Sequence, residues 1–510
     1  MNKHEYDIIV IGGGATGLGV ALEAQSRGYK TLLLEAYDFG KGTSSKSTKL
    51  VHGGIRYLAN LDFALVKEGL HERYYFLQNA PHLAKPQTYL VPFYSWMDKL
   101  KYFIGIKLYD FLSGKQKIGK SKFLSKTQVL EYHNAPDLVS QNLIGGAVYN
   151  DGQFDDTRLL ISILRTFLQL GGCAFNYAEV KQILKDKNHK ACGVRVLNTF
   201  TNNSTEYLAN VVINATGVLT DRLLNIDEPQ KNHHNVTAAQ GTHLVFEKNI
   251  FNSPHALVIP KTIDNRILFV LPWLDKIIVG TTDIIVDKPT IEPIASNNEV
   301  DFIIETLQQY TKHAVSRSDI KAKFAGLRPL VTPDNNSSTA KISRKHEILQ
   351  SRSNLISIVG GKWTIYRLMG EDTINYIIDK NLIEPKGKSI TKTLHLFGYI
   401  IDNTQYPLKA YGCDYNKILD IQQELENFDK LHNNLPYYQA EVIYHVRYEM
   451  AKTVEDVLAR RTRALYLDAK ASIECAETVA KLMANELKFD NNWILLQVFE
   501  FGNYANNYLA

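Results

Sequence analysis

The chain has 510 residues, 45% hydrophobic and 22% charged, a balance typical of a globular protein with two or three domains. Lysine and arginine exceed aspartate and glutamate by 58 − 53 = 5, which does not indicate nucleic-acid binding but suits an acidic small substrate or an anionic membrane surface. The cysteines are scattered without a CxxC pair, which predicts a reducing compartment and no metal site. We see no leader peptide and no apolar run of ~18 residues, and therefore expect a cytoplasmic protein, dissolved or lying on a membrane.

The first predicted elements are a buried strand, a glycine-rich turn and a helix. Residues 7–11 are Asp7 followed by four apolar residues, and they lead through the glycines into a helix that ends near Gly28. A second strand over 31–34 ends at Glu35. This pattern is typical of a Rossmann-like α/β domain, in which a helix N-terminus holds a pyrophosphate and the acidic tip accepts hydrogen bonds from ribose. Glu35 argues against the 2′-phosphate of NADP. The turn residues expected to hold the dinucleotide are Gly12, Gly14, Ala15, Thr16 and Gly17.

A loop rich in glycine and hydroxyl residues follows, over residues 40–58. Alone it predicts either a ligand-binding loop or a flexible serine-rich loop. Beside the dinucleotide pattern, its sequence TSSKSTKLVHGGIRYL resembles the FAD-dependent glycerol-3-phosphate dehydrogenases of the D-amino-acid-oxidase-like flavoprotein superfamily. The resemblance implies FAD as the cofactor and places this segment beside the flavin ring. The residues that match are Thr43, Ser44, Ser45, Ser47, Lys49, His52, Gly53, Gly54, Arg56 and Tyr57.

The next elements are a helix over 62–80, a strand over 86–94 and a basic amphipathic segment over 98–122. That segment carries aromatic and aliphatic residues, including Phe103 and Phe111, beside seven lysines. Its pattern is typical of a helix in a membrane interface and equally of a surface helix with a solvated lysine fringe. From Gly152 onward, an acidic opening followed by apolar spacing predicts a capped helix.

Further along the chain, a strand over 211–214 ends in a turn of small residues. The resemblance implies that Ala215, Thr216 and Gly217 in this turn approach the FAD. Strands are then predicted over 242–246, 256–259, 267–271 and 277–280, as in an antiparallel sheet that caps a substrate.

Polar groups that could face a substrate come from separated places. An isolated His243 is most often a satisfied histidine, and the default interpretation of Arg328 is a surface salt bridge. The resemblance instead implies that both lie at the active site. It also implies that Gly361, Lys362 and Thr364, where a helix begins, face the flavin. The cations and the aromatic residue expected to bind the substrate and its phosphate are Arg56, Tyr57, Arg328, Arg344 and Lys362.

The expected reaction is oxidation of the secondary alcohol of sn-glycerol 3-phosphate to a ketone, dihydroxyacetone phosphate. It requires hydride transfer to the flavin and removal of the hydroxyl proton. His243 is the expected proton acceptor, Arg328 can share that role, and the helix that begins near Lys362 points the positive end of its dipole at the flavin. In this family the electrons pass to membrane ubiquinone, so a peripheral position on the inner face of the cell membrane is expected.

Beyond residue 388 the spacing predicts an all-helical domain, with helices over 414–430, 437–449, 452–469 and 471–488. The basic segment over 446–463 also resembles the same dehydrogenases and predicts a packed helix with solvated charges, not a nucleic-acid site. We expect FAD-binding parts over 1–85, 145–235 and 325–388, cap parts over 86–144 and 236–324, and a helical domain over 389–510. A glycerophosphate oxidase and a non-catalytic FAD-binding membrane scaffold remain alternatives, and the sequence leaves a homodimer open.

Overall fold

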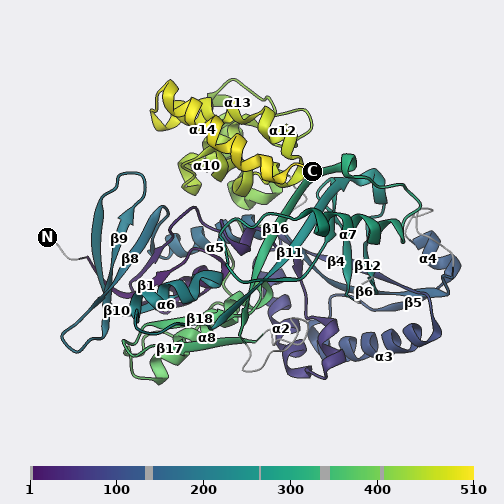
Figure 1. The fold of residues 1–510 in the computed structure, drawn as a ribbon, viewed down its shortest axis with the longest axis horizontal. Helices are drawn as coiled ribbons and strands as arrows, with labels where there is room; N and C mark the ends of the chain where they lie inside the picture. The colour runs from purple at the N-terminus through teal and green to yellow at the C-terminus, as the bar shows by residue number, and fades with distance from the viewer. Residues whose placement is uncertain (1–3, 133–141, 263–265, 333–344, 402–406) are drawn as a thin grey trace.

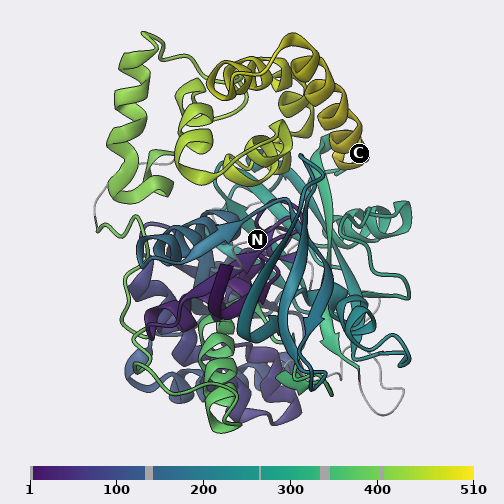
Figure 2. The same cartoon turned by 90° about the vertical axis from the view of Figure 1, so that its left-hand side faces the viewer.

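A computed structural model describes residues 4–132, 142–262, 266–332, 345–401 and 407–510. Two β-sheets lie side by side with helices around them, and helices from the end of the chain cover one side of both (Figure 1). The view turned by 90° shows the same yellow-green helices above the rest of the molecule (Figure 2). The architecture confirms the predicted α/β fold with a second, largely antiparallel sheet and a C-terminal helical domain.

The first sheet is organised around β1 (His4–Ile11), whose residues Ile8 to Ile11 are buried. This strand pairs in parallel with a strand on each side, and its continuous apolar run fits a position covered on both faces. The other strands are β2 (Thr31–Leu34), β7 (Cys173–Phe175), β8 (Ala178–Lys185), β9 (Ala191–Asn198), β10 (Ser204–Asn214), β17 (His346–Gln350) and β18 (Ile356–Gly360). The helices around them are α1 (Ala15–Ser26), α5 (Asp156–Gln169), α6 (Thr220–Asp227) and α8 (Tyr366–Asp379).

The second sheet is organised around β11 (Val236–Glu247), a buried strand that pairs antiparallel with three others. Its predicted strands over 242–246, 256–259, 267–271 and 277–280 are all confirmed. The other strands are β3 (Leu50–Val51), β4 (Ala84–Phe93), β5 (Lys122–Ser125), β6 (Gly145–Phe154), β12 (Ala256–Ile259), β13 (Leu268–Trp273), β14 (Lys276–Gly280), β15 (Ile284–Val286) and β16 (Ile320–Val331). Its helices are α2 (Phe63–Asn79), α3 (Trp96–Ser113), α4 (Lys126–Tyr132) and α7 (Asn297–Gln308).

The predicted start of a helix at Gly152 is wrong. Residues 152–154 end β6, which pairs along its length with β4, and the helix α5 begins at Asp156. Asp155 caps that helix by accepting a hydrogen bond from the backbone N–H of Arg158, at 3.2 Å. The whole of β6 is hydrogen-bonded into the second sheet, although the predicted domain division assigns 145–154 to an FAD-binding part.

The C-terminal part is helical, as predicted, but the single helix expected over 452–469 is wrong. A π-helical turn, Asp456–Arg461, comes first, and Arg463 then takes a left-handed conformation with φ of 67° before the chain resumes helices. The α-helices of this part are α9 (Tyr415–Glu424), α10 (Gln439–Glu449), α11 (Ala464–Leu467), α12 (Ala469–Glu474), α13 (Ala476–Leu487) and α14 (Asn491–Ala505).

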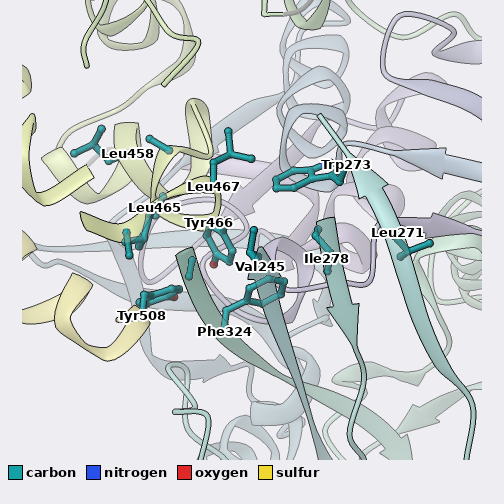
Figure 3. Close-up of a cluster of buried hydrophobic side chains, with 14 of the residues drawn as sticks. Val245, Leu271, Trp273, Ile278, Phe324, Leu458, Leu465, Tyr466, Leu467 and Tyr508 are labelled. Atoms are coloured by element: carbon teal, nitrogen blue, oxygen red, sulfur yellow. The ribbon is translucent and has the colours of Figure 1, made fainter. Parts of the chain in front are cut away.

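The C-terminal helices pack against the second sheet through a shared hydrophobic cluster. Figure 3 shows Tyr466 of α11 beside Phe324 of the sheet and Leu467 of α11 toward Trp273. Burial of such large apolar side chains contributes about 1.5–3 kcal/mol each, so this contact joins the two parts firmly.

Three of the four arginines over 446–463 are buried, so the expectation of solvated charges is wrong for these three and holds for Arg447. Arg460, Arg461 and Arg463 are at most 1% exposed. Asp38 accepts hydrogen bonds from Nε of Arg460 at 2.5 Å and from Nη1 of Arg461 at 2.7 Å. These contacts hold the pKa of Asp38 below its usual value despite burial, so the C-terminal part is also joined by charge pairs to the loop after β2.

The helix α3 carries an exposed apolar surface, as the sequence suggests. Ile106 and Tyr109 are buried against the body of the protein. The exposed apolar side chains are Trp96, Met97, Leu100, Phe103, Ile104 and Phe111. In the residue ranges that the structure describes, no helix has both the length and the hydropathy needed to span a bilayer.

Candidate active site

The glycine turn between β1 and α1 is built as the sequence predicts. Gly12 has φ of 112°, and a Cβ atom there would lie 2.5 Å from the carbonyl oxygen of Ala215. A Cβ atom on Gly17 would lie 1.8 Å from the carbonyl oxygen of Gly12, so neither position accepts a side chain. The helix begins at Gly14 without a side-chain cap. The turn therefore brings bare backbone and a helix N-terminus to the place where a pyrophosphate is expected.

Glu35 lies at the end of β2, next to this turn. Its carboxylate accepts hydrogen bonds from the backbone N–H of Gly13 at 2.6 Å and of Tyr37 at 2.9 Å. Burial raises the pKa of Glu35, and these two bonds oppose the shift. The contact to Gly13 fixes the acidic tip to the glycine turn, and each oxygen keeps a second lone pair for a ribose hydroxyl.

The hydroxyl-rich loop connects the glycine turn to the second sheet. Its short helix η1 (Thr43–Ser45) places Oγ of Ser44 where it accepts a hydrogen bond from the N–H of Ala15, at 2.9 Å. The indole of Trp363 donates to the carbonyl of Ser44, and the hydroxyl of Thr43 donates to the carbonyl of Leu327 on β16, at 2.5 Å. The loop is thus held across both sheets.

Two predicted cofactor residues of this loop point into the protein. Ser47 Oγ donates to Asp156 at 2.7 Å, and Lys49 Nζ donates to the same carboxylate at 2.5 Å and to the carbonyl of Ser45 at 2.9 Å. Burial, followed by the charge of Arg463, lowers the pKa of Lys49 to about 7. Their role as cofactor contacts stays a prediction, because both side chains are engaged with Asp156.

The segment after β3 forms a second group of candidate residues. The N–H of His52 donates to Thr364 Oγ1 at 3.3 Å, and Lys362 Nζ lies 3.5 Å from the carbonyl oxygen of His52. That ammonium is also 5.3 Å from the ring centroid of Tyr57. The strand β18 delivers Lys362 and Thr364 to this place through a turn at Gly361, which has φ of 79°. The predicted residues His52, Tyr57, Lys362 and Thr364 therefore meet.

Gly53 links this segment to α3. Its N–H donates to the hydroxyl of Tyr109 at 2.9 Å, and that hydroxyl donates to the buried carboxylate of Asp151 at 2.7 Å. The next residue, Gly54, has φ of 86° and lies directly under the ring of Tyr57. Arg56 is in the following short helix η2 (Ile55–Asn60), but its side chain lies outside the part of the chain that the structure describes.

The turn after β10 faces the glycine turn. The N–H of Ala215 donates to the carbonyl of Ile11 at 2.8 Å, and Thr216 donates its hydroxyl to Asn214 at 2.7 Å. Gly217 follows with φ of 61°. The close approach of Ala215 to Gly12 places this turn beside the glycine turn, and its approach to the FAD stays a prediction.

His243 lies in the middle of β11 and is 2% exposed. Its ring stacks on Phe324 with centroids 4.8 Å apart, and on the other side a Cβ atom at Gly280 would lie 2.4 Å from its Cδ2. Nε2 is 2.9 Å from the hydroxyl of Thr48, whereas Nδ1 is buried and has no hydrogen-bond partner among the described residues. Burial, and then the charges of Arg328 and Lys49, hold the pKa of His243 well below its ordinary value, so the imidazole is neutral at neutral pH.

Arg328 lies on β16, on the same face of the sheet as His243. A Cβ atom at Gly241, two residues before His243, would lie 2.5 Å from Nη2 of Arg328. Nη1 donates to Asp283 at 2.7 Å, and Nη2 donates to Thr281 and to the carbonyl of Thr282, both at 3.1 Å. These bonds fix the guanidinium in place, and the side chain is 22% exposed. Arg344 lies outside the described residues.

Three residues that matter here were missed from the sequence. Thr48 bonds to His243 and could have been included, because it stands inside the hydroxyl-rich motif. Asp156 accepts hydrogen bonds from Ser47 and Lys49 of the loop. Its position at the acidic start of a helix predicted only a role in capping that helix. Asp283 fixes Arg328 and lies at a strand end that gives no sequence signal.

Two family descriptions match the chain. "FAD dependent oxidoreductase" covers residues 7–367, and "C-terminal domain of alpha-glycerophosphate oxidase" covers residues 353–493.

Named relatives cover nearly all of the chain. A probable mitochondrial glycerol-3-phosphate dehydrogenase of Dictyostelium discoideum is 39% identical, over 96% of this chain and 82% of the relative. The mitochondrial glycerol-3-phosphate dehydrogenase of Rattus norvegicus is 37% identical, over 100% of this chain and 74% of the relative.

Solved structures have the same architecture. The glycerol-3-phosphate dehydrogenase from Bacillus halodurans, complexed with FAD, is 28% identical with a TM-score of 0.80, and the match covers 100% of this chain and 96% of that one. The FAD-bound L-alpha-glycerophosphate oxidase of Mycoplasma pneumoniae is 16% identical with a TM-score of 0.60, covers 79% of this chain and 100% of that one, and shows the fold alone.

Proposed function

The chain belongs to the FAD-dependent glycerol-3-phosphate dehydrogenases, and from this premise we propose that it oxidises sn-glycerol 3-phosphate to dihydroxyacetone phosphate and passes the electrons to membrane ubiquinone. The observation that carries the proposal is that a neutral His243 and Arg328 lie on the same face of the second sheet. The hydroxyl-rich loop contacts this face through Thr48, which is hydrogen-bonded to His243.

FAD is the cofactor, and the residues present fit it. Glycine at positions 12 and 17 lets the backbone of the turn pack closely, so that the N-terminus of α1 can face a pyrophosphate, and Glu35 stands where a ribose is expected. Ser44 and Thr364 hold the backbone of the loop beside which the flavin ring is expected. Bound FAD supplies the hydride acceptor.

The cations near the site bind the phosphate of the substrate. Arg328 presents a fixed guanidinium, and the ammonium of Lys362 lies near the ring of Tyr57. Asp283 reduces the net charge at Arg328, so a phosphate dianion requires at least one more cation, and Arg56 and Arg344 fill this role by the family resemblance. Binding the remote phosphate holds the substrate carbon that loses the hydride.

His243 accepts the hydroxyl proton through Nδ1. Its Nε2 is paired with Thr48, whereas Nδ1 is the buried nitrogen without a partner among the described residues. For Nδ1 to accept a proton, Nε2 must carry the hydrogen and donate it to the threonine hydroxyl. A low pKa keeps the imidazole neutral and ready to accept, and Arg328 nearby stabilises the developing alkoxide.

The electron acceptor is a lipid-soluble quinone, reached from the inner face of the cell membrane. The exposed apolar side chains of α3, among them Phe103 and Phe111, support this assignment because they suit insertion into one leaflet. The lysines around α3 add attraction to anionic lipid of about 1 kcal/mol each.

Anaerobic spectroscopy of the purified protein tests the proposal. Glycerol 3-phosphate should bleach the flavin absorbance and glycerol should not, and a quinone analogue should restore the colour faster than dissolved oxygen. Acid precipitation should release the FAD, which is held without a covalent bond. Flavin that glycerol 3-phosphate cannot bleach would contradict the substrate, and fast recovery with oxygen alone would favour a glycerophosphate oxidase.

A further inference from the structure

Two side chains of the C-terminal helical part pack behind residues of the candidate active site. The first is Arg463, which is fully buried and bridges the hydroxyl-rich loop and α5. Its Nη2 donates to the carbonyl of Ser45 at 2.8 Å, and its Nη1 donates to Thr157 Oγ1 at 2.9 Å. The same guanidinium lies 3.3 Å from the carboxylate of Asp156. One residue of the C-terminal part thus holds both the loop and the carboxylate to which the loop is tied.

Lys49 completes this buried group from the loop side. Its ammonium donates to the same carbonyl of Ser45 and to Asp156, so two cations converge on one carbonyl and one carboxylate. Aromatic rings surround the ammonium, with the centroid of Phe324 at 5.5 Å and that of Tyr466 at 5.6 Å.

Tyr466 is the second of these two C-terminal residues. Its ring meets the ring of Phe324 edge to face, with centroids 4.9 Å apart (Figure 3). The ring of Phe324 in turn stacks on His243. The guanidinium of Arg463 lies 4.1 Å from the centroid of Tyr466. Tyr466 therefore supports both the charged group and the ring on which the candidate base rests.

The contacts of Arg463 and Tyr466 are connected to His243, the candidate base, in two ways. The loop residue Thr48 stands next to Lys49 in the chain and bonds to Nε2 of His243, and Phe324 fixes the plane of the imidazole. Displacing Arg463 or Tyr466 would disturb one of these contacts and leave the residues that face the phosphate, such as Arg328, in place.

We propose that Arg463 and Tyr466 are positioning residues for proton and hydride transfer, which makes the C-terminal helical part a component of the catalytic unit. They hold residues 45–49 and Phe324 so that Thr48 keeps His243 oriented. This inference rests on the proposed function of His243 as the base.

The first test compares Arg463→Lys with Arg447→Lys in the full-length, FAD-loaded enzyme. Arg447 makes bonds to two carboxylates within the C-terminal part and is the matched control. Arg463→Lys should lower the limiting rate of anaerobic flavin reduction about tenfold, since small misplacements in a reacting geometry are costly, with the Kd for glycerol 3-phosphate changed less than about threefold. Arg447→Lys should leave both quantities unchanged.

A double-mutant cycle separates positioning from general damage. If Arg463 acts through Thr48, combining Arg463→Lys with Thr48→Val should slow reduction by much less than the product of the single effects. Independent effects that multiply would overturn this route, as would an Arg463→Lys variant with an unchanged rate. Either result can be told apart from an error in the assignment of His243 as the base, because that error would appear as an unchanged rate of flavin reduction in His243→Ala.

The ring of Tyr466 offers a second variant pair in case the arginine variant does not fold. Tyr466→Phe keeps the ring and should retain the reduction rate, whereas Tyr466→Leu removes the contact with Phe324 and should slow reduction about tenfold at similar Kd. The visible circular dichroism of the bound flavin should change in the leucine variant alone. Equal rates in both variants would contradict a positioning role for the ring.

Discussion

At the scale of residues, burial sets the protonation states around the candidate active site. It lowers the pKa of Lys49 to about 7 and that of His243 well below its usual value, so two groups that are often cations carry less charge here. The guanidinium of Arg328, by contrast, stays protonated at any relevant pH. Phosphate binding and proton acceptance are therefore assigned to different side chains.

Replacing the arginines of the phosphate site should weaken substrate binding. Arg328→Ala and Arg56→Ala should each raise KM for glycerol 3-phosphate and lower kcat/KM about tenfold or more, because a charge-assisted hydrogen bond contributes about 1.5–3 kcal/mol. Steady-state kinetics with a quinone analogue measure this. Arg317→Ala, which removes an exposed guanidinium paired with Asp301, is the control and should be silent. Normal kinetics in the two site variants would place the phosphate elsewhere.

Removing the candidate base should affect the chemical step. His243→Ala should lower kcat more than it raises KM, and the rate should recover partly at high pH, where hydroxide can take the proton. The measurement is the pH dependence of anaerobic flavin reduction under saturating substrate. A reduction rate equal to that of the parent enzyme at all pH values would exclude His243 as the base.

His82 should make the fold sensitive to acid. It lines a small cavity with Arg158 and Tyr411, and burial followed by the charge of Arg158 lowers the pKa of His82 to about 4. The unfolded chain binds a proton near pH 6.5, so this contribution to stability is present above about 6.5 and is lost as pH falls toward 4. Between about pH 7.5 and about pH 5 the loss should be about 2 kcal/mol.

Thermal unfolding of His82→Gln at these two pH values checks this. The drop in Tm between them should be smaller in the variant than in the parent, while His313→Gln, at an exposed position, should behave like the parent. An equal drop in all three proteins would exclude His82 as the acid-sensitive group.

At the scale of elements, α3 serves two surfaces at once. Its buried side contributes Tyr109, which contacts Gly53 of the flavin-side segment, and its outer side exposes large apolar residues. A helix with this division suits the membrane interface because the apolar side can enter one leaflet without spanning it.

Charges on the outer side of α3 should detach the protein from membranes. Phe103 and Phe111 are 45% and 80% exposed, so Phe103→Glu with Phe111→Glu should leave the fold intact, reduce pelleting with anionic liposomes and slow quinone reduction. Anaerobic flavin reduction by substrate should be unchanged. The matched control is Leu495→Glu with Phe499→Glu on α14, where exposure is similar at 70% and 68%. If the control is released and the α3 variant still pellets, the anchor lies in the C-terminal part.

Elements with regular periodicity could be predicted from the sequence, and those shaped by distant charges could not. The strands around β1 and β11 follow from apolar runs bounded by turns. The break in the helix expected over 452–469 arises because Arg460, Arg461 and Arg463 bind partners far away in the chain, such as Asp38. Local sequence carries no information on such partners, and it likewise gave no sign of the role of Asp283.

At the scale of the whole molecule, buried charge pairs join the C-terminal part to the FAD-binding part. Arg158 on α5 donates two hydrogen bonds, both 2.7 Å long, to Glu449 at the end of α10. These bonds outweigh the effect of burial and lower the pKa of Glu449 to about 2. A buried pair of this kind fixes the geometry of an interface, because either charge alone would be unsatisfied.

Breaking this pair should destabilise the whole protein. Glu449→Ala leaves Arg158 buried without its carboxylate and should cost about 3–5 kcal/mol, seen as a lower Tm and earlier loss of FAD on heating. The double replacement Arg158→Met with Glu449→Leu should recover most of the stability. Glu424→Ala, which removes an exposed partner of Arg447, should leave Tm unchanged. An unaltered Tm in Glu449→Ala would mean that the pair does not hold the interface.

The pairing of Asp38 with Arg460 and Arg461 also sets an order of events during protein synthesis. The residues are 422 and 423 positions apart, and a ribosome adding about 5–20 residues per second needs about 20–80 s to travel between them. Throughout that interval the carboxylate of Asp38 has been made, whereas its two arginine partners have not. These charge pairs can join the C-terminal part to the loop after β2 only when translation is almost complete, so prematurely terminated chains should reach the cell's chaperones and proteases without this contact.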